Sequence, residues 1–369
     1  MTTCLLFLAA MCLAYANGAN DNFKGVATLF GSGTTTYRQA LTWATVTTLL
    51  GSLAAVVLAQ QLMKNFSGRG LVGDELVAAP RFLAAVGLGS GGAVLLATRF
   101  GLPISTTHGL VGALVGAGWA AGSTIDVSKL TGSFVIPLLL SPLVSIAVTF
   151  LIYLALRTAR CRLGVCHETC FCIGSETVAT SPVCCDSALI MQQAQELTAS
   201  MGTTVTCRQR YAGRLVGIEV GQTIDGLHYL SSGVVSFARG LNDTPKIAAL
   251  LLFLPALAGG WSPLVIGLAI AAGSLFGARR VAEVLSHRIT SLNAGQGFTA
   301  NVLTGTIVIG ASLFGWPVST THVSCGALFG IGLATRQAHW HMIGTIVLAW
   351  ITTLPASALL GALAWSCLP

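Results

Sequence analysis

The sequence predicts an all-α polytopic membrane protein in which one unit occurs twice. Of the 369 residues, 54% are hydrophobic and only 8% are charged, with a mean hydropathy of +0.79. Soluble domains carry about 25% charged residues. The composition therefore places most of the chain in lipid, and it excludes an ordinary soluble enzyme or a nucleic-acid-binding protein.

A long segment that occurs twice reveals the duplication. Residues 101–118 read GLPISTTHGLVGALVGAG and residues 315–332 read GWPVSTTHVSCGALFGIG, with 11 of 18 positions identical. Upstream, GANDNFKG at 18–25 corresponds to GLNDTPKI at 240–247, 222 residues later. The same markers occur in the same order, so both copies carry the same polar residues.

The apolar segments predict broken helices as well as full spans. They lie near 1–16, 40–59, 82–98, 109–125, 132–156, 228–238, 247–258, 262–278, 298–313, 323–335 and 342–366. Several are shorter than the roughly 20 residues of a full span, and Gly and Pro interrupt them beside the repeated motifs. We therefore expect discontinuous or re-entrant helices and about 10 to 12 membrane segments. The first run is expected to be a permanent helix and not a cleaved signal, because no positive region precedes it.

The predicted organisation has three parts: a first membrane repeat at 1–156, a hydrophilic insert at 157–226, and a second membrane repeat at 227–369. The insert holds seven of the 11 cysteines. Arginines near its flanking helix ends indicate a cytoplasmic insert, where thiols stay reduced. We expect scattered reduced thiols. Metal binding and redox sensing remain alternatives, although the spacings C-x-C and C-C are not the C-x2-C of ordinary zinc sites.

Two aspartates, Asp21 and Asp243, lie in otherwise apolar sequence. A charge at the centre of a bilayer costs about 2.5–3.5 kcal/mol or more, so such residues are candidates for function. Asn20 and Asn242 precede them, and carbonyl and carboxylate oxygens are ligands that hard cations such as Na⁺ prefer. Alternatively, each aspartate pairs with the lysine three residues later on its helix.

The two Ser-Thr-Thr-His segments predict an anion site. Pro followed by Ser or Thr marks a helix start, where free N–H groups and the positive end of the helix dipole favour an anion. The six hydroxyls of these segments can donate to its oxygens, unless they only cap their own helices. His108 and His322 are expected to anchor the helix starts, with proton transfer as the alternative. The six hydroxyl residues are Ser105, Thr106, Thr107, Ser319, Thr320 and Thr321.

The ordered set GANDNFKG, GLPISTTHG, ARGLNDTPKIAALL and GWPVSTTHVSCGA resembles the inorganic phosphate transporter (PiT) family, over nearly the whole chain outside the insert. The resemblance implies two inverted-topology repeats and a midplane site for phosphate at the six hydroxyl residues with Asn20 and Asn242. It also implies cation binding at Asp21 and Asp243, with the same asparagines and with Glu283. Gln61 occupies the place equivalent to Glu283 in the first copy.

These observations predict a secondary active transporter, and not an enzyme, that imports phosphate with Na⁺ or H⁺ by alternating access. No cofactor is expected beyond the coupling cation, and Na⁺ is assigned to Asp21 and Asp243. We expect a multi-pass protein of the plasma (inner) membrane, in contact with lipid; a homodimer is left open. The alternatives are a sulfate permease of the same family and a membrane-embedded enzyme, whose catalytic set would occupy one half only.

Overall fold

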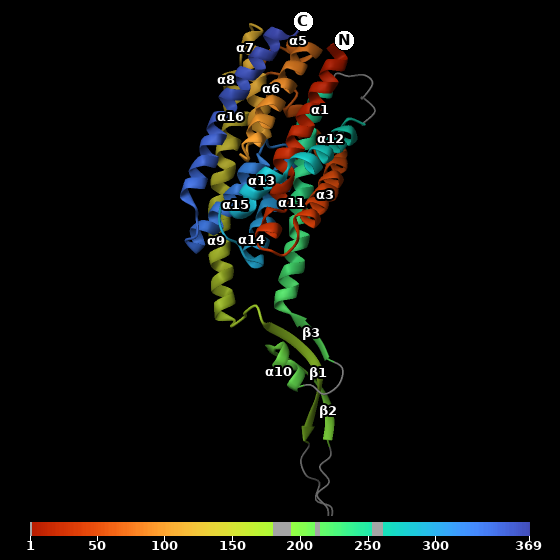
Figure 1. The fold of residues 1–369 in the computed structure, drawn as a ribbon, viewed down its shortest axis with the longest axis vertical. Helices are drawn as coiled ribbons and strands as arrows, with labels where there is room; N and C mark the ends of the chain where they lie inside the picture. Colours follow the sequence, from red (N-terminus) through yellow and green to blue (C-terminus); the bar gives the residue numbers. More distant parts are fainter. Residues whose placement is uncertain (1, 180–192, 211–214, 253–260) are drawn as a thin grey trace, which may run out of the picture. The chain divides into compact units, whose positions relative to one another are not determined.

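The structure is a computed structural model that describes residues 2–179, 193–210, 215–252 and 261–369 (Figure 1). The chain forms two compact units. The first combines Met1–Tyr153 with His228–Pro369 and contains both copies of the repeated motifs. The second, Leu154–Leu227, contains the insert.

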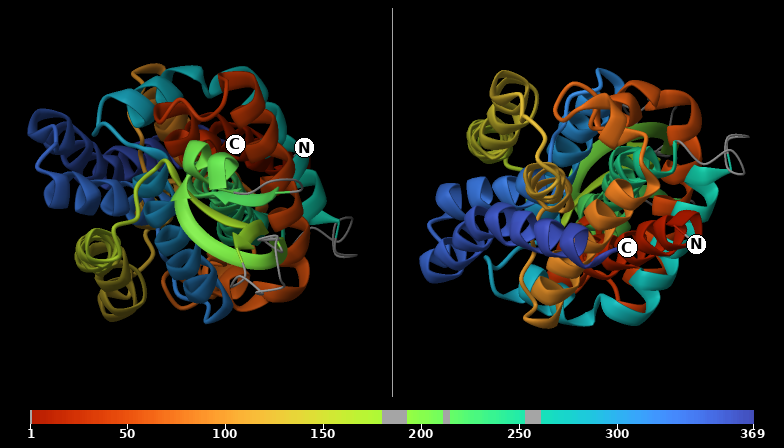
Figure 2. Two further views of the ribbon diagram at one scale, coloured as in Figure 1. Left: turned by 90° about the horizontal axis from the view of Figure 1, so that it is seen from below. Right: turned by 90° about the horizontal axis from the view of Figure 1, so that it is seen from above.

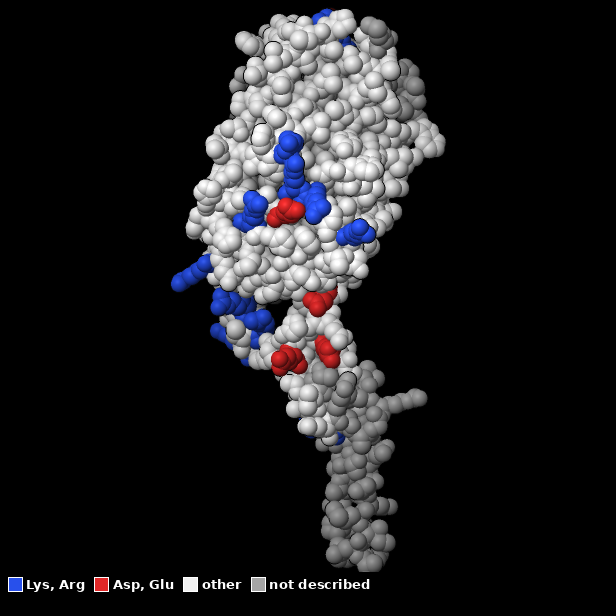
Figure 3. Space-filling view, viewed as in Figure 1, with Lys and Arg blue, Asp and Glu red and all other residues white. Residues whose placement is uncertain are grey.

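The described part of the first unit is helical, which confirms the predicted all-α membrane class. Five described helical segments are long and apolar enough to cross a membrane, or six if one bent pair counts as a single span. Figure 3 shows that most of the visible face of this unit carries no Lys, Arg, Asp or Glu. The helices that begin in the first copy are α1 (Thr2–Asp21), η1 (Asn22–Gly25), α2 (Ala27–Gly31), α3 (Tyr37–Leu58), α4 (Gln60–Asn65), α5 (Asp74–Val77), α6 (Pro80–Arg99), α7 (Thr106–Ala120), α8 (Val127–Leu130), η2 (Thr131–Val135) and α9 (Ile136–Arg162). Those that end in the second copy are α11 (Val220–Ala248), which begins in the insert, η3 (Ala249–Leu251), α12 (Ser262–Gly277), α13 (Arg279–His287), α14 (Ala294–Leu313), α15 (Thr320–Thr335) and α16 (Trp340–Cys367).

Broken helices occur at equivalent places in the two copies. α12 and α13 are bent by 74° at their junction, and α3 and α4 are separated at Ala59. α7 and α15 have 15 and 16 residues, fewer than the roughly 20 that a full span needs. Both begin at the repeated Ser-Thr-Thr-His segment. α6 with α7, and α14 with α15, form two helical hairpins, and each hairpin carries this polar segment at its tip.

Glycines let the two copies interlock. A Cβ atom on Gly18 of α1 would lie 1.9 Å from the Ile270 carbonyl oxygen of α12, and one on Gly240 of α11 would lie 2.1 Å from the Thr48 carbonyl oxygen of α3. Small residues allow such close approach of helix backbones in membranes. The first helix of each copy therefore packs on the apolar helix α12 or α3 of the other copy, and Figure 2 shows helices from both halves of the chain in one bundle.

The insert contains a three-stranded antiparallel sheet that the sequence analysis did not predict. Its strands are β1 (Thr169–Ala179), β2 (Gln193–Thr203) and β3 (Leu215–Glu219), in the order β2-β1-β3. The helix α10 (Thr204–Arg210) follows β2 directly. In the register, Cys170 of β1 lies opposite Gly202 of β2 and Glu219 of β3.

The expectation of scattered thiols is wrong for three cysteines. Cys170 and Cys172 lie on one face of β1, because alternate residues of a strand point the same way. Cys207 of α10 meets them there and forms a disulfide with Cys172. Cys161 and Cys166 are exposed and free. The remaining pair, Cys184 and Cys185, lies outside the described residues.

Candidate functional site

The candidate site lies where α1 and α11 meet the tips of the two hairpins. Asp21 is the last residue of α1, whereas Asp243 lies inside α11, two residues before Pro245. Both aspartates and both preceding asparagines are buried inside the helical unit. The structure thus brings together the acidic and amide residues of the two copies that the sequence analysis singled out.

Each aspartate forms an ion pair with the lysine of its own copy. Lys24 pairs with Asp21, and Lys246 Nζ lies 3.5 Å from Asp243 Oδ1. The alternative in which each aspartate pairs with its own lysine therefore describes this structure. A threonine of the same copy's hairpin also donates to each carboxylate, at 2.8 Å from Thr106 to Asp21 and 3.3 Å from Thr320 to Asp243.

The asparagines hold the backbone of the hairpins. Asn20 Oδ1 accepts a hydrogen bond from the Ile104 amide at 3.1 Å, and Asn20 Nδ2 donates to the Leu102 carbonyl at 3.0 Å. In the second copy, Asn242 Nδ2 donates to the Val318 carbonyl at 3.3 Å. Each asparagine also bonds to a hydroxyl at the end of the preceding long helix, Thr98 or Ser312. Asn20 and Asn242 therefore fix the position of each loop relative to its aspartate.

The lysines connect the two copies. Lys246 Nζ donates to Thr107 Oγ1 of the first hairpin at 2.9 Å and to the Val318 carbonyl of the second at 2.7 Å. Lys24 makes the equivalent contacts from the first copy: it donates to Thr321 Oγ1 of the second hairpin and to the Ile104 carbonyl of the first. These reciprocal bonds place both hairpin tips around the two ammonium groups.

Arg239 and Asn17 occupy equivalent positions, 222 residues apart, yet differ in charge. Arg239 Nη1 donates to Asn17 Oδ1 at 3.1 Å and Nη2 donates to Asn22 Oδ1 at 3.2 Å. Asn17 Nδ2 in turn lies 3.0 Å from Asp21 Oδ2 and 3.3 Å from Asp243 Oδ2. The sequence analysis missed this link as part of the site, although the offset between the copies would have revealed the pair.

The electrostatic balance of this cluster is positive. Lys24, Lys246 and Arg239 are buried with the two aspartates. Among the described residues of the cluster, three positive charges against two negative ones leave a formal charge of +1. Arg239 Nε is buried and has no hydrogen-bond partner in the described part of the chain. Because the N-terminal ends of α7 and α15 add partial positive charge, the arrangement favours an anion.

The serines cap their helices, as predicted. Ser105 Oγ accepts from the His108 amide at 3.2 Å, and Ser319 Oγ accepts from the His322 amide at 3.3 Å. Each histidine Nδ1 lies within hydrogen-bond distance of a carbonyl of a long helix, Trp350 or Leu138. The two imidazole rings contact each other with centroids 4.6 Å apart. This geometry agrees with histidines that anchor the helix starts.

Glu283 does not join this cluster. Its side chain is more than half exposed and lies 3.5 Å from Arg279 on the same helix. These two residues are four positions apart, so their side chains lie on the same side of the helix. Gln61, its equivalent, is exposed on α4. The sequence alone could not show this, because the packing of α13 buries Val281, Ala282 and Leu285 and leaves Glu283 on its exposed face.

The fold and the site define a polytopic membrane transport protein with two reciprocal polar half-sites. The chain belongs to the phosphate transporter family, whose profile matches residues 17–361. It is therefore a phosphate transporter and a multi-pass membrane protein rather than an enzyme.

Similar proteins extend over nearly the whole chain. A relative from Pyrococcus abyssi, provisionally named a phosphate permease, is 27% identical over 97% of this chain and 96% of its own length. The chloroplastic inorganic phosphate transporter 2-1 of Arabidopsis thaliana is 26% identical over 94% of this chain and 69% of its own length. A solved structure named a sodium-dependent phosphate transporter shares the fold, with a TM-score of 0.75 and 20% identity over 99% of this chain and 98% of that one.

Proposed function

We propose that this phosphate transporter is a secondary active importer that couples phosphate to Na⁺ or H⁺ by alternating access between two inverted repeats. The observation that carries the proposal is the reciprocal bonding of Lys24 and Lys246 to the opposite hairpins. In transporters with inverted repeats, the substrate site lies at the interface between the repeats, and one repeat moves against the other to open it to each side of the membrane. The lysine bonds form such an interface between the two copies.

Phosphate binds, in this proposal, between the two hairpin tips. The ammonium groups of Lys24 and Lys246 already lie against Thr321 and Thr107. Hydroxyl and N–H donors around a dianion form charge-assisted hydrogen bonds, which are roughly twice as strong as neutral ones. Arg239 adds the third cation. The hydroxyls proposed to contact phosphate are those of Ser105, Thr106, Thr107, Ser319, Thr320 and Thr321, with Asn20 and Asn242 placing the loops.

The charge balance gives a physical reason for coupling. A dianion added to a site of formal charge +1 leaves a buried charge of −1, which is costly in a low-dielectric interior. A monovalent cation bound together with phosphate makes the site neutral. The oxygens of Asp21, Asp243, Asn20 and Asn242 are the proposed ligands. Glu283 is left out, because it is exposed and paired with Arg279.

The lysines supply the link between cation and anion. In the structure, Lys24 and Lys246 neutralise the two aspartates. A cation or proton that takes the place of a lysine at its carboxylate frees that ammonium group for the anion. Phosphate binding likewise draws the lysine from the carboxylate and favours the cation. Such coupling is reciprocal: each ligand raises the affinity for the other by the same factor.

The proposed topology is inverted, with the insert in the cytoplasm and the protein in the plasma (inner) membrane. α1 and α11 run in opposite directions in Figure 1, and the bonds of Lys24 and Lys246 to the opposite hairpins are reciprocal, which supports a two-fold relation. Arg157, Arg160 and Arg162 lie at the end of α9, where the positive-inside rule counts them as cytoplasmic.

Sodium is the first coupling ion to test, because the solved relative with this fold is named sodium-dependent. The purified protein is reconstituted into proteoliposomes, and uptake of labelled phosphate is measured with Na⁺ and pH gradients imposed separately. We expect one gradient to drive accumulation and the other to have little effect. If phosphate uptake without any imposed gradient equals the uptake with a Na⁺ or pH gradient, the protein is a uniporter or a channel and the proposal is wrong.

A further inference from the structure

The insert is held together by sulfur where a larger unit would have an apolar core. In the described part of Leu154–Leu227, the buried apolar side chains are Cys170, Cys172 and Cys207. The other face of the sheet leaves Phe171 and Ile173 about half exposed. Units this small usually depend on disulfides or a structural metal, because their cores are too small to stabilise them.

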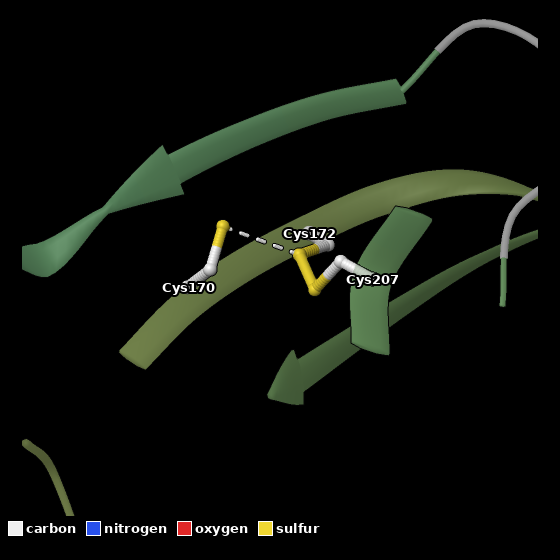
Figure 4. Close-up of side chains that lie close together, drawn as sticks. All are labelled: Cys170, Cys172 and Cys207. Atoms are coloured by element: carbon white, nitrogen blue, oxygen red, sulfur yellow. Dashed lines mark hydrogen bonds between the residues drawn. A yellow bond between two sulfur atoms is a disulfide. The ribbon is translucent and has the colours of Figure 1, made fainter. Parts of the chain in front are cut away.

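Three sulfur atoms converge at one point of this unit (Figure 4). Cys170 Sγ lies 3.3 Å from Cys172 Sγ, and all three sulfurs lie within 4.8 Å of one another. A disulfide between Cys172 and Cys207 uses two of them. The third cysteine, Cys170, is buried beside this disulfide and remains a free thiol.

Two glycines of the neighbouring strands lie beside the three sulfurs. Gly217 of β3 faces the cluster: a Cβ atom there would lie 3.1 Å from Cys170 Sγ and 4.0 Å from Cys172 Sγ. A Cβ atom on Gly202 of β2 would lie 3.9 Å from Cys207 Sγ. The backbone of β3 thus approaches the sulfur atoms closely at Gly217, whereas at Gly202 the Thr206 hydroxyl fills the space, 2.5 Å from where a Cβ atom would lie.

We propose that the three cysteines, when reduced, bind one thiophilic metal ion, Cu⁺ or Zn²⁺. Thiolates select these ions over harder cations. At a zinc–sulfur distance of about 2.3 Å, sulfurs of a tetrahedral site lie about 3.8 Å apart, which is 0.5 Å more than the 3.3 Å between the Cys170 and Cys172 sulfurs. Cu⁺ is satisfied by three thiolates, whereas Zn²⁺ takes a water molecule as fourth ligand.

The chemistry of loading balances without an unnamed reactant. A cellular dithiol, or two molecules of a low-molecular-weight thiol, reduces the Cys172–Cys207 disulfide with two electrons and two protons and is itself oxidised to a disulfide. Three cysteine thiols then release up to three protons as the metal–sulfur bonds form. The proposal takes from the proposed function only the cytoplasmic side of the insert, where thiols are kept reduced.

The test uses the full-length protein in detergent and does not depend on transport. Protein reduced with a dithiol and stripped with a chelator is loaded anaerobically with Zn²⁺ or, separately, with Cu⁺, desalted, and analysed by elemental mass spectrometry. We expect one ion per chain in at least one arm. The ion should be lost when Cys170, Cys172 and Cys207 are replaced by Ser together, and kept in the matched control Cys184→Ser/Cys185→Ser.

A single variant keeps the test valid if the triple variant misfolds. Cys170→Ser leaves the disulfide partners intact and should weaken metal binding by at least ~100-fold, since one of three ligands is lost. No metal in either wild-type arm, or equal loading of the triple variant, would overturn the proposal. So would full oxidation of Cys172 and Cys207 in intact cells, measured by rapid alkylation. Cys166 serves as the internal control for alkylation, because it is exposed and a hydrogen bond with the Thr169 hydroxyl lowers the pKa of its thiol.

Discussion

Replacing Thr321 with Val removes one hydroxyl from the proposed phosphate site while keeping the shape of the side chain. Thr321 is fully buried at the start of α15. Its Oγ1 accepts a hydrogen bond from the Lys24 ammonium group and donates to the Ile104 carbonyl at 2.8 Å. The substitution therefore breaks the contact between the lysine of one copy and the hairpin of the other.

The expected cost follows from the charge on the donor. A hydrogen bond to a charged group contributes about 1.5–3 kcal/mol, and 1.4 kcal/mol corresponds to a factor of ten in affinity. Thr321→Val should raise the apparent KM for phosphate roughly 10- to 100-fold. The cation requirement should persist, because both aspartates are intact. Thr107→Val removes the equivalent acceptor of Lys246 and should act in the same direction.

The assay is the initial rate of labelled phosphate uptake into proteoliposomes at a saturating gradient of the coupling ion. Thr335→Val is the matched control, because this threonine lies at the other end of α15 and bonds only to carbonyls of its own helix. Its KM should equal that of the wild type. Unchanged KM values in both Thr107→Val and Thr321→Val would place the anion elsewhere.

Three further changes test the charges and the topology. Asp21→Asn and Asp243→Asn should each abolish coupled uptake in a protein that still purifies as a folded species; normal uptake with an unchanged cation requirement would remove the aspartates from the mechanism. Arg239→Asn reduces the formal charge of the site to zero and should raise the phosphate KM at least ~10-fold, with partial rescue by Lys; a wild-type KM would make Arg239 purely structural. Single cysteines at Arg69 and Ser291, in a cysteine-depleted background, should be labelled from opposite sides of the membrane, and labelling from the same side would contradict inverted repeats.

The sequence predicted the residues of the site better than their contacts. The repeated Asn-Asp and Ser-Thr-Thr-His segments pointed to residues that the structure brings together, because duplication marks polar residues in an apolar chain. The ion pairs between neighbouring residues such as Asp243 and Lys246 also follow from helical spacing. The bond from Lys246 to Thr107 does not, since it depends on how the copies interlock.

Other features could not be predicted because they arise from tertiary packing. The resemblance assigned Glu283 to cation binding, yet its side chain is more than half exposed and lies 3.5 Å from Arg279. The link from Arg239 through Asn17 to both aspartates involves residues of different type at equivalent positions. The cysteines of the insert looked scattered, because their clustering required a sheet that places Cys170 and Cys172 on one face.

Equilibrium binding of labelled phosphate to the purified protein, measured across a range of Na⁺ concentrations and at several pH values, tests whether cation and phosphate binding are coupled. One of these cations should raise the affinity for phosphate, and phosphate should raise the affinity for that cation by the same factor. The dependence should disappear in Asp21→Asn. An affinity for phosphate that is independent of both Na⁺ and pH would contradict coupling through the buried charges of this site.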